Sequence, residues 1–270
     1  MFDDVDAIAL RLADIAVEAG ELLRRMQDGV GDHRVKENGT PTCAADLAAE
    51  DLILSCLARA WPGIPIVAEE TANQAAPGQH FFSVDPLDGT ADFLHGTGEY
   101  TVNIALIADR RPVAGVVAAP SLGRIWMAGG SAQVGDIIDG SRNISWRPAR
   151  VRSAPTTGLV ALVSRRHGDV ATEACLSTLS IGTRRTASSA MKFCLIASGE
   201  ADIYVRCGPT MEWDTAAGDH ILTRAGGAVI GAGGRPLFYG REQDGYKNGP
   251  FAALGDPALA PRLSLPIATG

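Results

Sequence analysis

The sequence predicts an α/β fold in two halves, an α+β half over residues 1–150 and an α/β half over residues 151–270. Two observations lead to this prediction. In the first half, a run of strands joined by short turns follows two amphipathic helices. From about residue 155, strand-like and helix-like segments alternate, which is typical of helices flanking a sheet.

The composition excludes several classes of protein. The chain has 270 residues, with 46% hydrophobic and 20% charged residues, so it can bury a large core. The net charge of −7 argues against a general binder of nucleic acid or membrane surfaces, which needs a basic face. It does not exclude a small anionic substrate, because bound divalent cations invert the local charge.

The cysteines and the N-terminus indicate a reducing compartment. Five cysteines are present and no CxxC pair occurs, so we expect reduced, mostly buried thiols. The acidic N-terminus lacks a signal-peptide pattern, and no apolar run approaches the ~20 residues of a membrane span. We therefore expect a cytoplasmic protein without an integral membrane segment.

Two amphipathic helices open the first half. Apolar residues at spacings of three and four predict helices over residues 5–29 and 42–61, with an exposed loop between them. Thr42 is suited to cap the second helix. Asp46 falls in its first turn, where the helix dipole favours a carboxylate. Taken alone, Asp46 is equally well explained as a surface acid.

The strands of the first half come next. Apolar runs predict them at residues 64–68, 81–84, 101–108, 113–119 and 124–128, with weaker candidates at 132–134 and 144–146. Short turns join the strands from residue 101 to 128 into an antiparallel meander. Glu69 and Glu70 follow the first strand directly, and one of two adjacent acids must point back toward the sheet.

The second half alternates. Strands are predicted at residues 159–164, 182–187, 201–206, 228–230 and 251–254, and helices at 169–179, 189–198 and 214–225. The glycines at 231–234 are better explained as a turn than as a dinucleotide-binding loop.

One stretch carries most of the chemistry, Asp85-Pro86-Leu87-Asp88-Gly89-Thr90. Two carboxylates lie three residues apart at the end of a buried strand, and a helix can begin after Gly89. Carboxylates bind hard cations, and the free amides of a helix N-terminus bind phosphate. Together they suggest metal-assisted phosphoryl chemistry. The alternative is a purely structural Asp-Pro and Asp-Gly turn.

A second carboxylate segment is Trp213-Asp214-Thr215-Ala216-Ala217-Gly218. Its simplest explanation is that Asp214 caps a helix. However, Glu69, Asp85, Asp88 and Asp214 all lie at strand ends or helix starts, which gather in a ligand-binding crevice in open α/β folds. Four carboxylates without a histidine pair suit Mg²⁺ or Mn²⁺ better than Zn²⁺.

With these motifs in their order, the chain resembles the inositol monophosphatase family of Mg²⁺-dependent, lithium-sensitive phosphatases. The matching residues are Ala68-Glu69-Glu70, the Asp85 to Thr90 stretch and the Trp213 to Gly218 segment, and the Thr42–Asp46 helix start also fits. The resemblance covers roughly residues 5 to 255. It implies a layered αβαβα fold like that of sugar phosphatases.

The resemblance also implies a ligand set for two to three Mg²⁺ ions, with Mn²⁺ as a possible substitute. Glu69, Asp85 and the carbonyl of Leu87 would hold one ion. Asp85, Asp88 and Asp214 would hold a second, and Glu69 would contribute through water to a weaker third site.

Catalytic and phosphate-binding roles carry over in the same way. Thr90, paired with Asp46, would orient and deprotonate the attacking water, with Glu69 assisting. The Gly89 and Thr90 amides would bind the phosphate, and Asp214 would also face the substrate.

The substrate is a small phosphoester, and several segments resemble the CysQ-type 3′(2′),5′-bisphosphate nucleotidase branch: residues 98–106, 188–194 and 208–214. That branch removes the 3′-phosphate of adenosine 3′,5′-bisphosphate. A second phosphate needs a further cation, which Lys192, Arg165, Arg166 or His167 could supply. Each of these could equally be a surface charge.

Two other functions stay open. Ala91-Asp92 and the following residues 93–96 look more like the inositol monophosphatase branch, so inositol 1-phosphate, another sugar or polyol phosphate, or histidinol phosphate is an alternative substrate. A non-catalytic regulatory binding protein on the same fold is an alternative of another class. The chain could act as a monomer or a homodimer.

Overall fold

The computed structural model describes residues 4–27, 33–35, 41–71, 77–138, 144–165 and 168–266. Its helices are α1 (Val5–Gln27), α2 (Ala44–Ala60), α3 (Thr90–Leu94), α4 (Val170–Ser177), α5 (Met191–Ala197) and α6 (Ala216–Arg224). A seven-stranded sheet has the order β3-β4-β5-β6-β7-β8-β9, and a five-stranded sheet has the order β11-β10-β12-β16-β14.

The strands of the larger sheet are β3 (Ile66–Ala68), β4 (His80–Asp88), β5 (Thr101–Ala108), β6 (Arg111–Ala119), β7 (Arg124–Ala128), β8 (Ala132–Asp136) and β9 (Arg147–Pro148). Those of the smaller sheet are β10 (Leu159–Val163), β11 (Ile181–Thr186), β12 (Ile203–Arg206), β14 (Ala228–Gly231) and β16 (Phe251–Leu254). Two short ribbons complete the described chain: β1 (His33–Val35) with β2 (Pro41–Cys43), and β13 (Thr210–Met211) with β15 (Lys247–Asn248).

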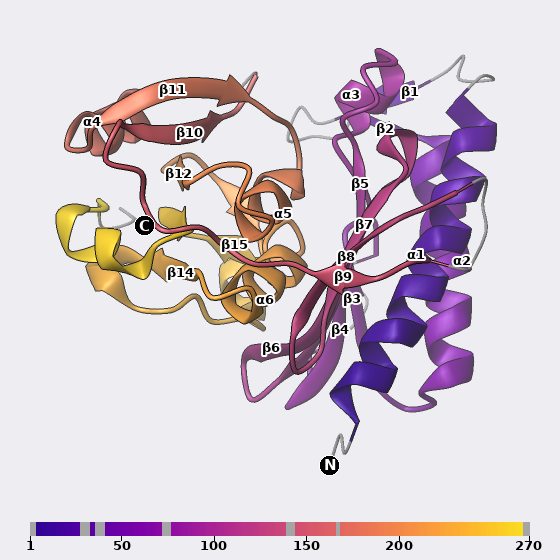
Figure 1. Cartoon of the computed structure of the whole chain (residues 1–270). Helices are drawn as coiled ribbons and strands as arrows, with labels where there is room; N and C mark the ends of the chain where they lie inside the picture. Colours follow the sequence, from indigo (N-terminus) through magenta and orange to yellow (C-terminus); the bar gives the residue numbers. More distant parts are fainter. Residues whose placement is uncertain are drawn as a thin grey trace.

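The elements stack as the predicted αβαβα layers (Figure 1). Helices α1 and α2 cover one face of the larger sheet, α5 and α6 lie between the two sheets, and α4 lies outside the smaller sheet. Because both faces of the larger sheet are covered, β5 is apolar along most of its length. Val102, Ile104 and Leu106 face α1 and α2, whereas Ala105 and Ile107 face the middle helices.

Small residues set how closely the middle helices approach the larger sheet. A Cβ atom on Gly115 of β6 would lie 3.1 Å from the Cα of Ala217, and one on Gly218 would lie 2.6 Å from the Phe193 ring of α5. The alanines and glycine at the start of α6 therefore let its N-terminal end lie against the sheet, beside the end of β4.

The structure corrects several predicted boundaries. Helix α2 begins at Ala44 with Cys43 as its N-cap, and Thr42 belongs to β2 instead of capping the helix. The expected loop before it includes the paired strands β1 and β2, while residues 28–32 and 36–40 lie outside the described chain. The strand expected at 144–146 does not form, and the two-residue strand β9 follows directly after those positions. Three-residue strands carry too little periodicity to be found from sequence.

The five cysteines are free thiols, and four of them are buried, as expected. The sulfur atoms of Cys175 and Cys207 lie 3.9 Å apart.

A buried carboxyl on α6 gives the fold a testable pH dependence. Asp219 is 1% exposed and accepts hydrogen bonds from the Tyr239 hydroxyl at 2.9 Å and the Thr223 hydroxyl at 3.2 Å. Burial raises the pKa of Asp219 to about 6. The folded state thus holds this proton more tightly than the unfolded state does. The free energy of unfolding should therefore fall as the pH rises from about 4 to about 6, by on the order of 3 kcal/mol from this group.

Asp219→Asn should remove that contribution. Denaturant unfolding at about pH 4 and about pH 7 would show the variant gaining stability relative to the parent at the higher pH. If the difference in unfolding free energy between the two proteins were the same at both pH values, the raised pKa of Asp219 would be contradicted.

Candidate active site

A β-bulge at the end of β4 brings two acids to one face of the sheet. Residues three apart on a regular strand point to opposite faces. Here Asp85 pairs with Asn103 of β5 and Asp88 pairs with Thr101, so Pro86 and Leu87 add one residue on the β4 side. Proline is tolerated at a bulge because it has no N–H to donate. Asp85 and Asp88 consequently both face the middle helices, and Leu87 packs on the other side.

Asp85 and Asp88 are each held by hydrogen bonds. The Leu87 N–H donates to Asp85 Oδ1 at 3.0 Å. Asp88 Oδ2 accepts from the Ala190 N–H at 2.6 Å and from Asn103 Nδ2 at 3.3 Å. Burial raises the pKa of Asp88, while the charge of Lys192 opposes that rise.

Asp214 comes from the loop before α6, and not from the helix as predicted. The N-cap of α6 is Thr215, and Asp214 accepts a hydrogen bond from the Met211 N–H at 2.8 Å. This loop is fixed from two sides. Arg206 donates to the carbonyls of its early residues Gly208 and Pro209. The buried carboxylate of Glu212 accepts from the N–H groups of Gly240 and Arg241.

Glu69 stands at the end of β3, next to β4. Its N–H donates to the Val84 carbonyl at 3.1 Å, which continues the parallel pairing of the two strands. Burial raises the pKa of Asp85 well above its ordinary value, and the charges of Glu69, Asp88 and Asp214 raise it further. The four predicted acids therefore share one electrostatic environment between the larger sheet and α6.

The donor chemistry of this cluster fits a hard divalent cation. Its oxygen atoms come from four carboxylates and, beside them, the Leu87 carbonyl. Within the described ranges, no three His, Cys, Asp or Glu side chains form a complete ligand set. Asp85, Asp88 and Asp214 instead each accept a hydrogen bond from a backbone N–H group. Repelling carboxylates with raised pKa values are groups that a cation would stabilise.

Thr90 and Asp46 form a buried pair across the α2 and α3 helix starts. The Thr90 hydroxyl lies 2.9 Å from Asp46 Oδ1 and 3.2 Å from the Leu87 carbonyl. Asp46 Oδ2 accepts from the Cys43 N–H at 2.8 Å, which caps α2. Asp46 is 1% exposed, so the surface-acid explanation is wrong. Burial raises its pKa, and the bonds from Cys43 and Thr90 oppose the rise.

Gly89 occupies a position that requires glycine. Its φ of 95° is left-handed, and a Cβ atom there would lie 2.5 Å from the Ser189 hydroxyl oxygen. The Asp92 and Phe93 N–H groups already donate to its carbonyl, closing the first turn of α3. The Gly89 and Thr90 amides, which are predicted to bind the phosphate, therefore lie at the turn that joins Asp88 to α3.

The cationic side chains that were predicted to bind the substrate differ in their burial and in their partners. Lys192 is buried, and its ammonium group donates to the carbonyls of Ser189 at 2.9 Å and Ala187 at 3.4 Å. Burial lowers its pKa to about 8. Arg165 is exposed and forms a 2.9 Å ion pair with Glu99. His167, like Arg166, lies outside the described residues.

One hollow lies within the described part of the second half, and a larger one lies between the two halves. The first, of about 150 Å³, opens at the carboxyl ends of β10 and β12 and is lined by Ser164, Tyr204 and Arg206. This is the side on which open α/β sheets bind ligands. Sequence reasoning missed Arg206, although its position at a strand end could have indicated it. Burial raises the pKa values of both Asp88 and Asp214, and the charge of Arg206 opposes that rise.

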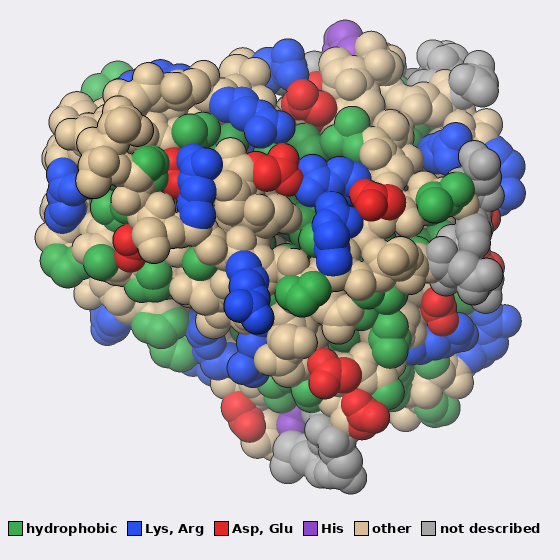
Figure 2. Space-filling view, in the orientation of Figure 1, with side chains coloured by type: hydrophobic (Ala, Val, Ile, Leu, Met, Phe, Trp, Pro, Cys, Tyr) green, Lys and Arg blue, Asp and Glu red, His purple; other side chains and the backbone are tan. Residues whose placement is uncertain are grey.

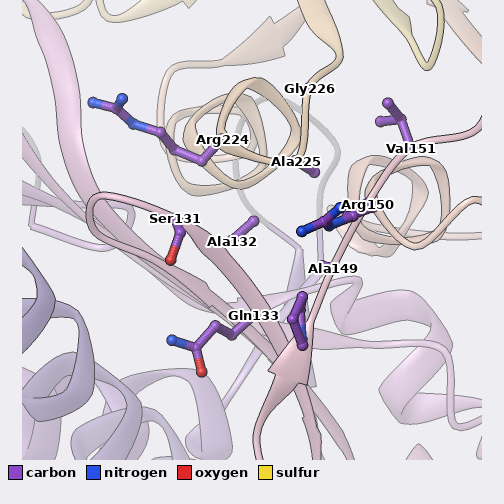
Figure 3. A pocket seen from close by; sticks show the side chains of 10 residues that line it. Ser131, Ala132, Gln133, Ala149, Arg150, Val151, Arg224, Ala225 and Gly226 are labelled. Atoms are coloured by element: carbon purple, nitrogen blue, oxygen red, sulfur yellow. The ribbon is translucent and has the colours of Figure 1, made fainter.

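The larger hollow, of about 550 Å³, lies between β8, β9 and the end of α6 (Figure 3). Arg150 and Arg224 line it, together with small residues, and none of the predicted site residues does.

On the face of the molecule seen in Figure 2, Lys and Arg side chains alternate with Asp and Glu. No described helix is both long and apolar enough to cross a membrane.

Comparisons with known proteins identify the family of this chain. The inositol monophosphatase family model matches residues 2–256. The 3′(2′),5′-bisphosphate nucleotidase CysQ of Escherichia coli K12 is 35% identical over 234 residues, covering 85% of this chain and 92% of that protein. The corresponding protein of Salmonella typhimurium is 36% identical over the same shares.

Solved structures give the same result. CysQ from Bacteroides thetaiotaomicron, a bacterial member of the inositol monophosphatase family, superposes with a TM-score of 0.77 at 31% identity, covering 92% of this chain and 97% of that one. An inositol monophosphatase from Anabaena, at 22% identity and a TM-score of 0.74, shares the fold. The chain belongs to the inositol monophosphatase family.

Proposed function

We propose that this protein is a Mg²⁺-dependent phosphatase that converts adenosine 3′,5′-bisphosphate to AMP and phosphate. The observation that carries the proposal is the electrostatic coupling of Asp85 to Glu69, Asp88 and Asp214, next to a buried Thr90–Asp46 pair whose hydroxyl also contacts the Leu87 carbonyl. The reaction class is supported by the family, and the substrate by the names of the CysQ relatives at 28–36% identity.

In this proposal Glu69, Asp85, Asp88, Asp214 and the Leu87 carbonyl hold two to three Mg²⁺ ions, which Mn²⁺ could replace. When bound, such ions neutralise the phosphate and favour formation of the attacking hydroxide. The Thr90 hydroxyl orients the attacking water, and its proton passes through Thr90 toward Asp46 Oδ1, 2.9 Å away. The Gly89 and Thr90 N–H groups bind the phosphate oxygens.

The second phosphate of the substrate requires cations near the site. Arg206 lines the hollow at the ends of β10 and β12, and Arg165 directly follows Ser164, which also lines it. Arg165 would exchange its partly buried Glu99 partner for the substrate phosphate. Lys192 is buried, and its positive charge offsets that of Asp88, so it is less available to bind the second phosphate.

The alternative substrates are inositol 1-phosphate and other sugar or polyol phosphates, which the residues 91–96 would favour. These compounds carry one phosphate and have no need of Arg165. The alternative from another class is a regulatory protein that binds phosphoesters without hydrolysing them.

Phosphate release from adenosine 3′,5′-bisphosphate tests the enzyme directly. We expect release with Mg²⁺, loss of it in excess EDTA, and recovery when Mg²⁺ or Mn²⁺ is restored. A colorimetric phosphate measurement over a panel of phosphoesters is sufficient. Absence of release from every compound, by a protein that still binds Mg²⁺, would favour the regulatory alternative.

A further inference from the structure

Two polar residues of β5 face the carboxylate cluster from the sheet. The register places Thr101 opposite Asp88 and Asn103 opposite Asp85. Directly opposed residues of antiparallel strands extend to the same face, with Cβ atoms about 4.5–5.5 Å apart. The side chains of Thr101 and Asn103 therefore lie beside the two proposed ligands on β4.

Both side chains are buried yet incompletely hydrogen-bonded. Thr101 is 0% exposed and Asn103 is 1% exposed. Asn103 Nδ2 donates to Asp88 Oδ2 at 3.3 Å, which fixes its Oδ1 as an acceptor. Among the described residues, neither Asn103 Oδ1 nor Thr101 Oγ1 has a hydrogen-bond partner.

Such atoms are costly, because a buried polar group without a partner has lost its hydration and gained no hydrogen bond in exchange. Native proteins bury few of them, and each calls for a reason such as a bound water or ion. The rest of β5 is apolar on both faces, so these two residues depart from its pattern only where the carboxylates lie. Valine and leucine would fill the same space without the penalty.

We propose that Thr101 and Asn103 are positioning residues of the metal centre, and that Thr101 Oγ1 and Asn103 Oδ1 accept hydrogen bonds from the hydration shell of the divalent cation. This inference rests on the proposed metal-dependent function. Mg²⁺ keeps several waters when it binds to proteins, and those waters are donors that need acceptors. Asn103 additionally holds the carboxylate of Asp88 through Nδ2.

If the Thr101 hydroxyl had a purely structural role, its removal would lower the stability of the metal-free protein, which is the opposite of what the proposal predicts. Thr101→Val keeps the shape of the side chain and removes only the hydroxyl. If the hydroxyl serves the hydrated cation, the variant in EDTA should be as stable as the parent or more stable, since it buries no unsatisfied oxygen. Its affinity for Mn²⁺, measured by titration calorimetry, should fall about tenfold, as is usual for outer-shell contacts.

The matched variants separate the explanations. Thr101→Ser restores the hydroxyl and should restore Mn²⁺ affinity to within about twofold of the parent. Asn103→Leu should weaken Mn²⁺ binding at least as much as Thr101→Val, because it also releases Asp88. Thr178→Val, whose hydroxyl bonds to the Cys175 carbonyl at the end of α4, should leave the affinity unchanged.

Unchanged Mn²⁺ affinity in both Thr101→Val and Asn103→Leu would overturn the inference. So would a Thr101→Val protein that is destabilised in EDTA with normal affinity, because that result assigns the hydroxyl a structural role. If the parent protein itself binds neither Mn²⁺ nor Mg²⁺, the metal-dependent function fails, which is a different outcome.

Discussion

Asp88→Asn is expected to lower metal-dependent kcat/KM by about 10³-fold, since the loss of one ligand charge removes about 4 kcal/mol of transition-state stabilisation. The amide oxygen can still accept the Ala190 N–H, so the bulge of β4 should persist. Burial raises the pKa of Asp88, so ionising it there is unfavourable. In EDTA the thermal midpoint of the variant should therefore equal or exceed that of the parent.

Phosphate release and thermal melting in EDTA are measured together for this variant. The matched control is Asp136→Asn, an exposed aspartate paired with Arg147 on the edge of the larger sheet, which should keep parental activity. An Asp88→Asn protein that retains activity would refute the assignment of Asp88 as a ligand. A protein that loses activity and also melts early would show instead that Asp88 is structural.

The second large loss of activity is expected when either member of the Thr90–Asp46 pair is replaced. Thr90→Val and Asp46→Asn should each lower kcat by about 10³-fold, the range of general base catalysis. Because the two residues act as one unit, the double variant should be about as slow as either single variant. The Mn²⁺ affinity should change little, since neither side chain is a proposed ligand. Multiplication of the two effects in the double variant would contradict a shared role.

The acids of the site were predictable because each lies in a short local pattern. Asp85 and Asp88 occupy a motif of six residues, and Asp214 follows a distinctive tryptophan. Their convergence depends on the bulge of β4, and the proline between them was the sequence feature that permitted it. The layered arrangement was predictable from alternating periodicity and from the resemblance.

The contacts that hold the acids were not predictable, because they join distant segments. Ala190 donates to Asp88 across 102 residues, and Gly240 donates to Glu212 across 28. Ser189 contributes too: its hydroxyl lies 2.8 Å from the Asp88 carbonyl, and its backbone has a positive φ of 60°. A serine in that conformation carries no sequence signal.

The burial of Lys192 was not predictable from the sequence either. Its sequence position at a helix start allowed an exposed cation that binds substrate, yet the side chain is 5% exposed and lies 4.9 Å from the centroid of the Tyr204 ring. Burial is decided by the neighbouring strands, which the local sequence does not specify.

The central claim is that this chain hydrolyses a bisphosphorylated nucleotide in preference to a phosphorylated polyol. The most direct measurement is the ratio of kcat/KM for adenosine 3′,5′-bisphosphate to that for inositol 1-phosphate, at saturating Mg²⁺. We expect a ratio well above one, with AMP as the nucleotide product. A ratio below one would contradict it and would assign the chain to the sugar or polyol phosphatases of the family.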